Sequence, residues 1–273
     1  MDLAKANKTI LEFQQLITKK SKKDYTGNLK VGVDLGTANV VLAVLDQDNQ
    51  PVAGASQSAS VVRDGLVVDY VEAVRIVRRL KEEVENILGM EITEAATALP
   101  PGTQGGNSKA MVNVVESAEI EVIEVVDEPT AAASILGIQD GAVVDVGGGT
   151  TGISILKEGK VTYTADEATG GTHMSLVLAG NYKVSFEEAE IIKKDIKRQK
   201  EVFVVIKPVV EKMASIVKRH IEGHNVDKVY LVGGACCFED FEKVFTKELG
   251  IPVFKPKNPM LVTPLGIALN CQK

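Results

Sequence analysis

Hydrophobic and polar positions follow two different periods along the chain. From Leu29 onward, short continuous apolar runs such as 40–45 are bounded by polar turns, which is typical of buried strands. Between these runs lie segments whose apolar residues recur every three or four positions, which predicts amphipathic helices. Strands and helices alternate through both halves of the sequence, and this order indicates an α/β fold.

The predicted elements can be placed along the chain. Further strands are predicted at 95–99, 119–126, 142–146, 153–156 and 228–232. Helices are predicted at 69–89, 108–117, 127–137, 185–200, 207–222 and 261–270. The helix over 69–89 is the clearest, because Val77, Leu80 and Val84 share one face and Gly89 ends it. In the 127–137 helix, Pro129 suits the first turn and Gly137 the end.

Residues 1–28 stand apart from this pattern. Ile10, Leu11, Phe13, Leu16 and Ile17 form an apolar face at helical spacing, which a lysine-rich run and a glycine then interrupt. One interpretation is an N-terminal helix docked on its own protein. The other is a detachable amphipathic tag for a partner, and the sequence leaves both open.

A glycine hairpin occurs twice. Two segments run from an apolar strand through Asp and Gly to a second apolar strand. They are VGVDLGTANVVLAVL at 31–45 and AVVDVGGGTTGISIL at 142–156. Glycine at the tip lets backbone N–H groups approach a phosphate, while the Asp suits Mg²⁺ or its water shell. Two copies indicate two related domains facing each other. A third segment, VYLVGGACCFEDFEK at 229–243, places Gly233 and Gly234 after a strand, where a base or ribose can lie against the backbone.

Composition excludes several function classes. The chain has 273 residues and a net charge of -6, which argues against a nucleic-acid partner. No apolar run reaches the ~20 residues of a membrane helix, and the N-terminus lacks a secretory signal layout. Cys236, Cys237 and Cys271 lack metal-ligand spacing and are expected to be thiols in a reducing cytosol. His220 and His224 are expected to form a surface pair past a helix end.

The ordered motifs resemble the actin/Hsp70/sugar-kinase superfamily. They are DLGT at 34–37, DEPTAAA at 127–133, DVGGGT at 145–150, LVGG at 231–234 and PLG at 264–266. The resemblance implies a two-domain actin-like ATPase fold of duplicated ribonuclease H-like domains, with outer subdomains reduced or absent. The implied boundaries are an extension at 1–28, domain I at 29–138 and 263–273, and domain II at 139–262.

Within the superfamily, four runs look like the EutJ family of ethanolamine-utilisation proteins. These runs are RDGLVVDY at 63–70, LPPGT at 99–103, GGGTTGIS at 147–154 and ADEATGGTHMSLVLAG at 165–180. This closer resemblance implies a cytoplasmic protein associated with a bacterial microcompartment. Its implied partners are ethanolamine-utilisation enzymes or microcompartment shell proteins.

The superfamily resemblance also implies a site for ATP or ADP with Mg²⁺. Asp34 and Asp145 would hold Mg²⁺ through water, and Glu128 would be the general base of the catalytic set. The implied nucleotide-binding residues are Gly36, Thr37, Gly147, Gly148, Gly149, Thr150, Gly170, Gly171, Glu190, Lys193, Gly233 and Gly234. Plainer interpretations stay open, with Glu128 as an acid at a helix N-terminus and Glu190 with Lys193 as a solvated ion pair.

Departures from the superfamily pattern favour binding over hydrolysis. The chain leaves no room for the outer subdomain that carries the phosphate-contacting lysine of Hsp70, and Gly152 replaces an acid. We therefore expect at most a slow ATPase, acting as a chaperone-like or reactivating factor for ethanolamine-degrading enzymes. The alternative is a non-hydrolysing, nucleotide-gated scaffold or polymer subunit. A small-molecule kinase is disfavoured because the substrate-pocket insertions are missing, and the oligomeric state stays open.

Overall fold

The computed structural model describes residues 3–63, 65–100 and 106–272. Asp64 and residues 101–103, which belong to two of the motif runs above, lie outside the described residues, as do 1, 2 and 273.

Two five-stranded sheets form the frame of the described chain. The first has the order β3-β2-β1-β6-β7 and the second the order β10-β9-β8-β11-β12. The strands of the first sheet are β1 (Lys30–Leu35), β2 (Asn39–Leu45), β3 (Pro51–Ser58), β6 (Glu94–Leu99) and β7 (Glu121–Asp127). Those of the second are β8 (Gly141–Val146), β9 (Thr151–Lys157), β10 (Lys160–Glu167), β11 (Val229–Val232) and β12 (Val253–Phe254).

The same topology occurs in both sheets. The first strand of each half pairs antiparallel with the second, and the second pairs antiparallel with the third. The first strand also pairs in parallel with the fourth, which pairs in parallel with the fifth. This shared order confirms the duplication that the two glycine hairpins predict.

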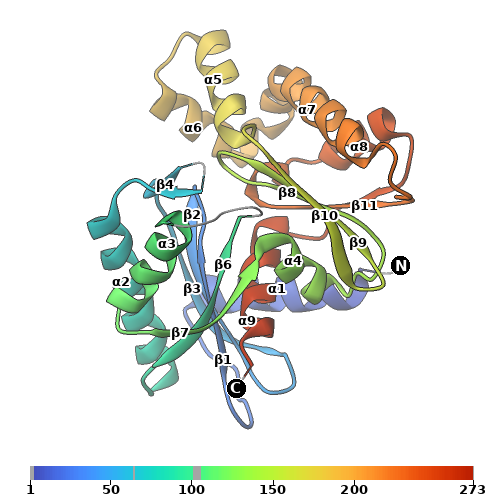
Figure 1. Cartoon of the computed structure of the whole chain (residues 1–273). Helices are drawn as coiled ribbons and strands as arrows, with labels where there is room; N and C mark the ends of the chain where they lie inside the picture. The colour runs from blue at the N-terminus through green and yellow to red at the C-terminus, as the bar shows by residue number, and fades with distance from the viewer. Residues whose placement is uncertain (1–2, 64, 101–105, 273) are drawn as a thin grey trace.

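Helices cover the sheets in layers (Figure 1). Their bounds are α1 (Ala4–Lys19), α2 (Tyr70–Leu88), α3 (Gly106–Ser117), α4 (Glu128–Leu136), α5 (Gly171–Tyr182), α6 (Phe186–Lys194), α7 (Gln199–Ile221), α8 (Phe241–Leu249) and α9 (Val262–Asn270). Short 3₁₀ segments are η1 (Ile196–Arg198), η2 (Gly234–Cys237) and η3 (Pro259–Leu261). Helices α2 and α3 pack on the first sheet, and α5, α7 and α8 pack on the second. One core cluster joins α1, α4 and α9 to strands of both sheets.

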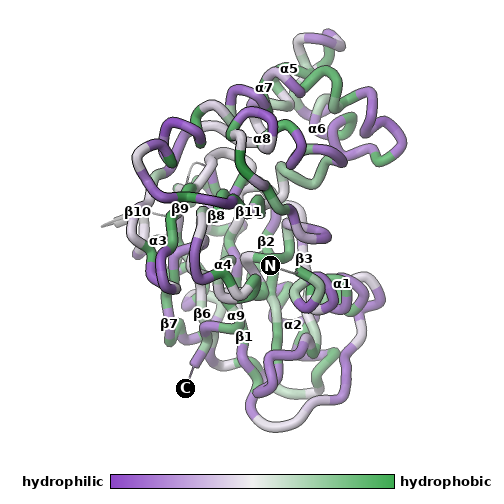
Figure 2. The backbone as a smooth tube through the Cα atoms, turned by 90° about the vertical axis from the view of Figure 1, so that its right-hand side faces the viewer, coloured by the Kyte–Doolittle hydropathy of each residue, from purple (hydrophilic) through white to green (hydrophobic). Residues whose placement is uncertain are grey.

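The two inner helices cross with almost no space between them. A Cβ added to Gly266 of α9 would lie 1.9 Å from the carbonyl oxygen of Ala131 in α4. Only glycine fits at this crossing, and the close contact fixes both helices between the sheets. Hydrophobic segments run along the central strands on either side of this layer (Figure 2).

Local signals account for several elements. Asp69 caps α2 by accepting a hydrogen bond from the backbone of Glu72, and Gly89 ends the helix in the left-handed conformation. Asp127 caps α4 in the same way, with Pro129 in its first turn. The predictions for 69–89 and 127–137 are therefore confirmed to within a residue.

The predicted helix boundaries between 185 and 222 are wrong. Helix α6 ends at Lys194, and α7 begins at Gln199 and continues through Pro208. A proline removes one backbone hydrogen bond, to the residue four positions earlier. That residue, Val204, is 73% exposed, so water can satisfy its carbonyl while the buried face of α7 continues. Strands β3 and β10 and helix α5 were also not anticipated from the sequence.

The insertions between the core elements are short in the described residues. A two-stranded sheet of β4 (Val62–Arg63) and β5 (Leu66–Val67) lies between β3 and α2. Between α5 and α7 the chain forms only α6 and η1. This matches the reduced outer subdomains expected from the sequence, whereas the exact domain boundaries stay a prediction.

The N-terminal helix is docked on its own protein. Ile10 and Phe13 have no exposed surface, and both belong to the core cluster between the sheets. Leu11 was expected on the same face but is 42% exposed. It points away because it lies about 100° around the helix from Ile10, outside the stripe that Ile10 and Phe13 share.

Candidate nucleotide site

The first glycine hairpin joins β1 to β2 at the cleft between the two halves. Asp34 lies near the end of β1, opposite Val41 in the register. A Cβ on Gly36 would lie 2.7 Å from the carbonyl oxygen of Asn39, so the turn can only close tightly with glycine. Gly36, Thr37 and Asn39 line the cleft.

The second hairpin joins β8 to β9 and faces the first. The backbone N–H of Gly147 donates to the carbonyl of Thr150 over 2.9 Å, which closes the turn. A Cβ on Gly148 would lie 3.0 Å from the methyl carbon of Thr37. The tips of the two hairpins are therefore in close contact across the cleft, as the sequence repeat predicts.

Three carboxylates gather at the floor of the cleft. Burial, with the Asp145 charge, raises the pKa of Asp34 to about 7. Burial also raises the pKa of Asp145 to about 6, although a hydrogen bond from Thr263 opposes this rise. The pKa of Glu128, in the first turn of α4, is held well above its ordinary value by burial and then by Asp145 and Asp34.

Two further residues act on Asp145, and the sequence analysis did not single them out. In the sheet register, Gly152 of β9 is paired with Asp145 of β8 on one side and with Asp166 of β10 on the other. Residues directly opposite on antiparallel strands project to the same face, and the Asp166 charge raises the pKa of both Asp145 and Glu128. The Thr263 hydroxyl donates to Oδ2 of Asp145 over 2.9 Å. Asp166 falls within the 165–180 run, whereas no sequence signal connects Thr263 to Asp145.

Helix α5 begins against the second hairpin. The backbone N–H groups of Gly171 and Thr172 donate to the carbonyls of Gly147 and Gly148, over 2.9 Å and 2.7 Å. A Cβ on Gly170 would lie 2.8 Å from both of these carbonyl oxygens. Gly170 therefore supports the hairpin from behind, and Gly171 lines the cleft beside it.

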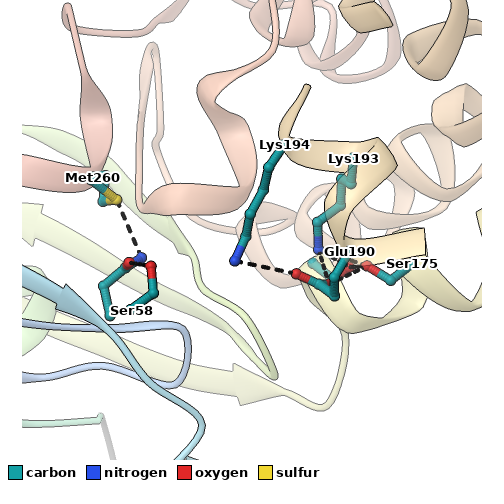
Figure 3. A network of polar contacts seen from close by, with 8 residues as sticks. Ser58, Ser175, Glu190, Lys193, Lys194 and Met260 are labelled. Atoms are coloured by element: carbon teal, nitrogen blue, oxygen red, sulfur yellow. Dashed lines mark hydrogen bonds and ion pairs between the residues drawn. The ribbon is translucent and has the colours of Figure 1, made fainter. Parts of the chain in front are cut away.

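A polar cluster joins α5 to α6 at the cleft wall (Figure 3). The Lys193 ammonium donates to the carbonyl of Gly171 over 3.0 Å and to the Ser175 hydroxyl over 2.7 Å, and it pairs with Glu190. Burial lowers the pKa of Lys193. Burial raises the pKa of Glu190, but hydrogen bonds from Lys193 and Ser175 outweigh this and leave it below the ordinary value. The predicted pair is thus partly buried, with Lys193 14% and Glu190 25% exposed.

Gly233 brings its segment directly against the carboxylates. It has φ of 92°, and a Cβ there would lie 2.3 Å from Oδ1 of Asp145. Its N–H donates to the carbonyl of Pro259 over 3.1 Å. Gly234 lies beside the Met260 side chain, whose sulfur accepts a hydrogen bond from the Asn39 amide over 3.3 Å.

The cleft brings most of the predicted site residues together. Those that line it are Asp34, Gly36, Thr37, Glu128, Asp145, Gly147, Gly148, Thr150, Gly171, Lys193, Gly233 and Gly234. Gly149, Gly170 and Glu190 were predicted but are not among the lining residues. Asn39, Met260 and Thr263 line the cleft without having been predicted.

The carboxylates fit a hard cation that keeps its water. No group of three His, Cys, Asp or Glu side chains in the described residues is arranged to hold a metal ion directly. Mg²⁺ usually binds through one or two carboxylates while retaining water and phosphate oxygens. Asp34 and Asp145, whose pKa values are raised first by burial and then by a neighbouring carboxylate, match that donor set.

One other sequence expectation fails away from the cleft. His220 lies in the last turn of α7 and is partly buried, rather than beyond the helix end. Its Nδ1 contacts the Tyr163 hydroxyl and its Nε2 contacts Glu167, both at 2.6 Å. These partners are on β10, a strand that the sequence analysis did not predict, so the two contacts were not foreseen.

Curated relatives match most of this chain. The ethanolamine utilization protein EutJ of Escherichia coli (strain K12) is 49% identical over 241 residues, covering 88% of this chain and 85% of the relative. The chain belongs to the EutJ family. The family model for type IV pilus assembly protein PilM also matches residues 110–263, which places the chain within that wider sequence family. The chaperone protein DnaK of Thermus thermophilus is 33% identical over 104 residues, 36% of this chain and 17% of the chaperone.

Solved structures confirm the fold. The crystal structure of EutJ from Carboxydothermus hydrogenoformans has a TM-score of 0.94 and 52% identity, covering 98% of this chain and 99% of its own. A PilM–PilN type IV pilus biogenesis complex has a TM-score of 0.74 at 14% identity, and the match covers 92% of this chain and 100% of the chain in the complex. MreB5 of Spiroplasma citri bound to ADP has a TM-score of 0.70 at 17% identity, and the match covers 89% of this chain and 95% of the MreB5 chain. The predicted actin-like architecture is therefore correct.

In the described part of the chain, no helix has the length and apolar character needed to cross a membrane.

Proposed function

We propose that this EutJ-family protein binds Mg²⁺-ATP and Mg²⁺-ADP in the cleft between its two halves. The observation that carries the proposal is the set of three carboxylates, Asp34, Asp145 and Glu128, on a floor walled by two glycine hairpins. Their charges repel bare phosphate, so an anionic ligand needs a divalent cation between itself and the floor. The likeness to MreB5 bound to ADP supports a nucleotide as that ligand.

Each wall would contact a different part of the nucleotide. Gly36, Thr37 and the 147–150 turn offer backbone N–H groups and hydroxyls to phosphate oxygens. Gly171, Gly233 and Gly234 provide the flat surface for ribose and base. Among the described lining residues, Lys193 is the one cation, and Glu190 and Ser175 orient it.

Hydrolysis would be slow. Bound Mg²⁺ would offset the phosphate charge and polarise the phosphoryl group to be transferred. Glu128 would take a proton from water, but its pKa, raised first by burial and then by the neighbouring carboxylates, disfavours the ionised form that a base needs. The same raised pKa favours the second candidate function, a scaffold that binds nucleotide without hydrolysing it.

The cellular role would be a chaperone-like or reactivating one. Membership of the EutJ family supports ethanolamine-utilisation enzymes or their microcompartment shell as partners, and a cytoplasmic location. The PilM–PilN type IV pilus biogenesis complex supports partner binding by this architecture, because there a protein of the same fold is in complex with another protein. Two domains, 29–138 with 263–273 and 139–262, would move relative to each other as nucleotide binds.

Calorimetric titration tests the nucleotide proposal. ATP and ADP are titrated with and without Mg²⁺, and GTP serves as the comparison ligand. We expect saturable binding of both adenine nucleotides that weakens sharply when Mg²⁺ is chelated. No heat with either nucleotide at millimolar concentration would overturn the proposal. Turnover measured with and without ethanolamine-degrading enzymes then separates the reactivating ATPase from the scaffold.

A further inference from the structure

Helix α1 packs on the first half of the molecule, in part through one aromatic ring. Phe13 has no exposed surface and packs on β3, where a Cβ on Gly54 would lie 2.3 Å from a ring carbon. The absence of a side chain at Gly54 makes the seat for this ring. Figure 2 shows α1 running beside β3.

The start of the same helix contacts the second half. The Asn7 side-chain oxygen accepts a hydrogen bond from the backbone N–H of Lys257 over 2.7 Å. Lys257 follows β12, and Lys255 anchors this segment to α8 through an ion pair with Glu242 at 2.8 Å. Helix α1 therefore connects the two halves on the side away from the cleft lining.

The segment that Asn7 holds continues into the cleft. The Pro259 carbonyl accepts a hydrogen bond from the backbone N–H of Gly233, and the next residue, Met260, lines the cleft beside Gly234. The Met260 sulfur also accepts from Asn39, which lies at the start of β2 beside the first hairpin. Only Asn258 and Pro259 thus separate Lys257, which Asn7 contacts, from Met260 at the cleft wall.

We propose that α1 positions this wall of the cleft. Through Asn7 it holds residues 257–261, and these fix the Pro259 carbonyl against Gly233 and the Met260 side chain against Gly234. Helix α1 thereby sets the affinity of the cleft for adenine nucleotide without contacting the ligand. This part of the inference rests on the proposed nucleotide binding.

Three variants isolate the contact. Asn7→Ala removes the acceptor, whereas Asn7→Asp keeps a side-chain oxygen in the same place. Thr9→Ala is the matched control, because the Thr9 hydroxyl bonds to the Lys5 carbonyl of its own helix. Asn7 is partly exposed, so the loss of one hydrogen bond leaves the protein folded, which the melting temperature of each variant verifies.

Amide hydrogen exchange of the nucleotide-free protein gives the first measurement. In Asn7→Ala we expect exchange to be about fivefold faster over 257–261 and at Gly233, the size expected for one hydrogen bond. Exchange in Asn7→Asp and Thr9→Ala should match the wild type. Unchanged exchange in Asn7→Ala, or equal acceleration in Thr9→Ala, would overturn the positioning role.

Titration with Mg²⁺-ADP gives the second measurement and separates the two proposals. We expect Asn7→Ala to bind about two- to fivefold more weakly, with Asn7→Asp restoring the affinity. If the wild type binds nucleotide and Asn7→Ala binds equally well, α1 does not position the cleft. If the wild type binds no nucleotide while exchange changes as expected, the proposed function fails and the contact between α1 and the 257–261 segment stands.

Discussion

At the scale of single residues, the cleft floor contains carboxylates that resist ionising together. Asp34, Asp145 and Glu128 come from two strands and a helix, and each has a raised pKa with burial as the largest cause. Asp166 adds to this charge from β10. Ionising these neighbouring buried carboxylates together is therefore unfavourable, and a divalent cation would offset their negative charge.

The stability of the Mg²⁺-free protein should fall as the pH rises. Because the folded-state pKa values of Asp34 (about 7) and Asp145 (about 6) exceed the ordinary value of 3.8, the folded state binds protons more tightly than the unfolded state. Their contribution is complete below pH ~4 and is lost as the pH rises through about 6 to 7. The melting temperature, measured by calorimetry from pH 5 to pH 8, should decrease accordingly. A shallower decrease in Asp34→Asn is the expected control, because Asp145 still titrates in that variant. A wild-type melting temperature that rises over this range would contradict the prediction.

Removing one of these charges should weaken cation-dependent binding. Asp145→Asn keeps the size of the side chain and an oxygen that can accept from Thr263. We expect its affinity for Mg²⁺-ATP to fall at least about tenfold, or ~1.4 kcal/mol, with the fold retained. Asp48→Asn, at an exposed turn, is the control and should bind as the wild type does. Equal affinity in Asp145→Asn would show that the carboxylate takes no part in the site.

Two glycines should respond in opposite ways to the same substitution. Gly233→Ala places a Cβ 2.3 Å from Oδ1 of Asp145 at φ of 92°, so the segment must shift and stability should fall by ~1–3 kcal/mol. Gly180→Ala lies in α5 with no atom within 4 Å of the new Cβ, and should stabilise by up to ~1 kcal/mol. Urea unfolding of both variants measures the difference. Similar changes in the two would show that the close approach at Gly233 imposes no constraint.

At the scale of elements, α1 is part of the fold that it precedes. Its apolar stripe enters the core cluster that α4 and α9 share, and its exit is tied to β3 by the backbone hydrogen bond from Lys23 to Val52. A detachable tag would keep that stripe exposed. The docked position therefore favours the first of the two interpretations that the sequence leaves open.

Stability measurements on α1 should reflect this docking. Phe13→Ala deletes a fully buried ring and should destabilise the protein by ~3–5 kcal/mol, because the seat at Gly54 becomes a cavity. Leu11→Ala, on the exposed side of the same helix, should change the free energy of unfolding by less than ~0.5 kcal/mol. Thermal unfolding of both variants is the measurement. An unchanged melting temperature in Phe13→Ala would support the detachable tag instead.

At the scale of the whole molecule, two similar sheets enclose one cleft. The duplicated strand order places the two Asp–Gly hairpins face to face, and the crossing of α4 and α9 holds the halves together. The short insertions add no further cation to the described lining besides Lys193. This architecture suits the binding of nucleotide better than its rapid hydrolysis.

Turnover should therefore be slow in the isolated protein. We expect ATP hydrolysis below ~1 s⁻¹, the lower end of typical enzyme rates, because burial and then the neighbouring carboxylates raise the pKa of Glu128 and disfavour its ionised form. Glu128→Gln should abolish the remaining turnover and retain nucleotide binding, as a coupled phosphate-release assay and a titration would measure. Hydrolysis at tens per second, or undiminished in Glu128→Gln, would assign the catalysis to another group.

The superfamily resemblance implied twelve of the residues that line the cleft. The sequence by itself determined the duplicated glycine hairpins and the helices over 69–89 and 127–137. These features are local, because turn geometry and helix ends are set by residues adjacent in the chain. Only the tertiary structure decided the rest. The Asp166 charge acts on Asp145 because β10 lies two strands from β8 in the sheet. The Thr263 hydroxyl can donate a hydrogen bond to Asp145 because α9 returns between the sheets. Helix α7 continues through Pro208, and α1 docks beside Gly54, because packing against distant residues outweighs local preference.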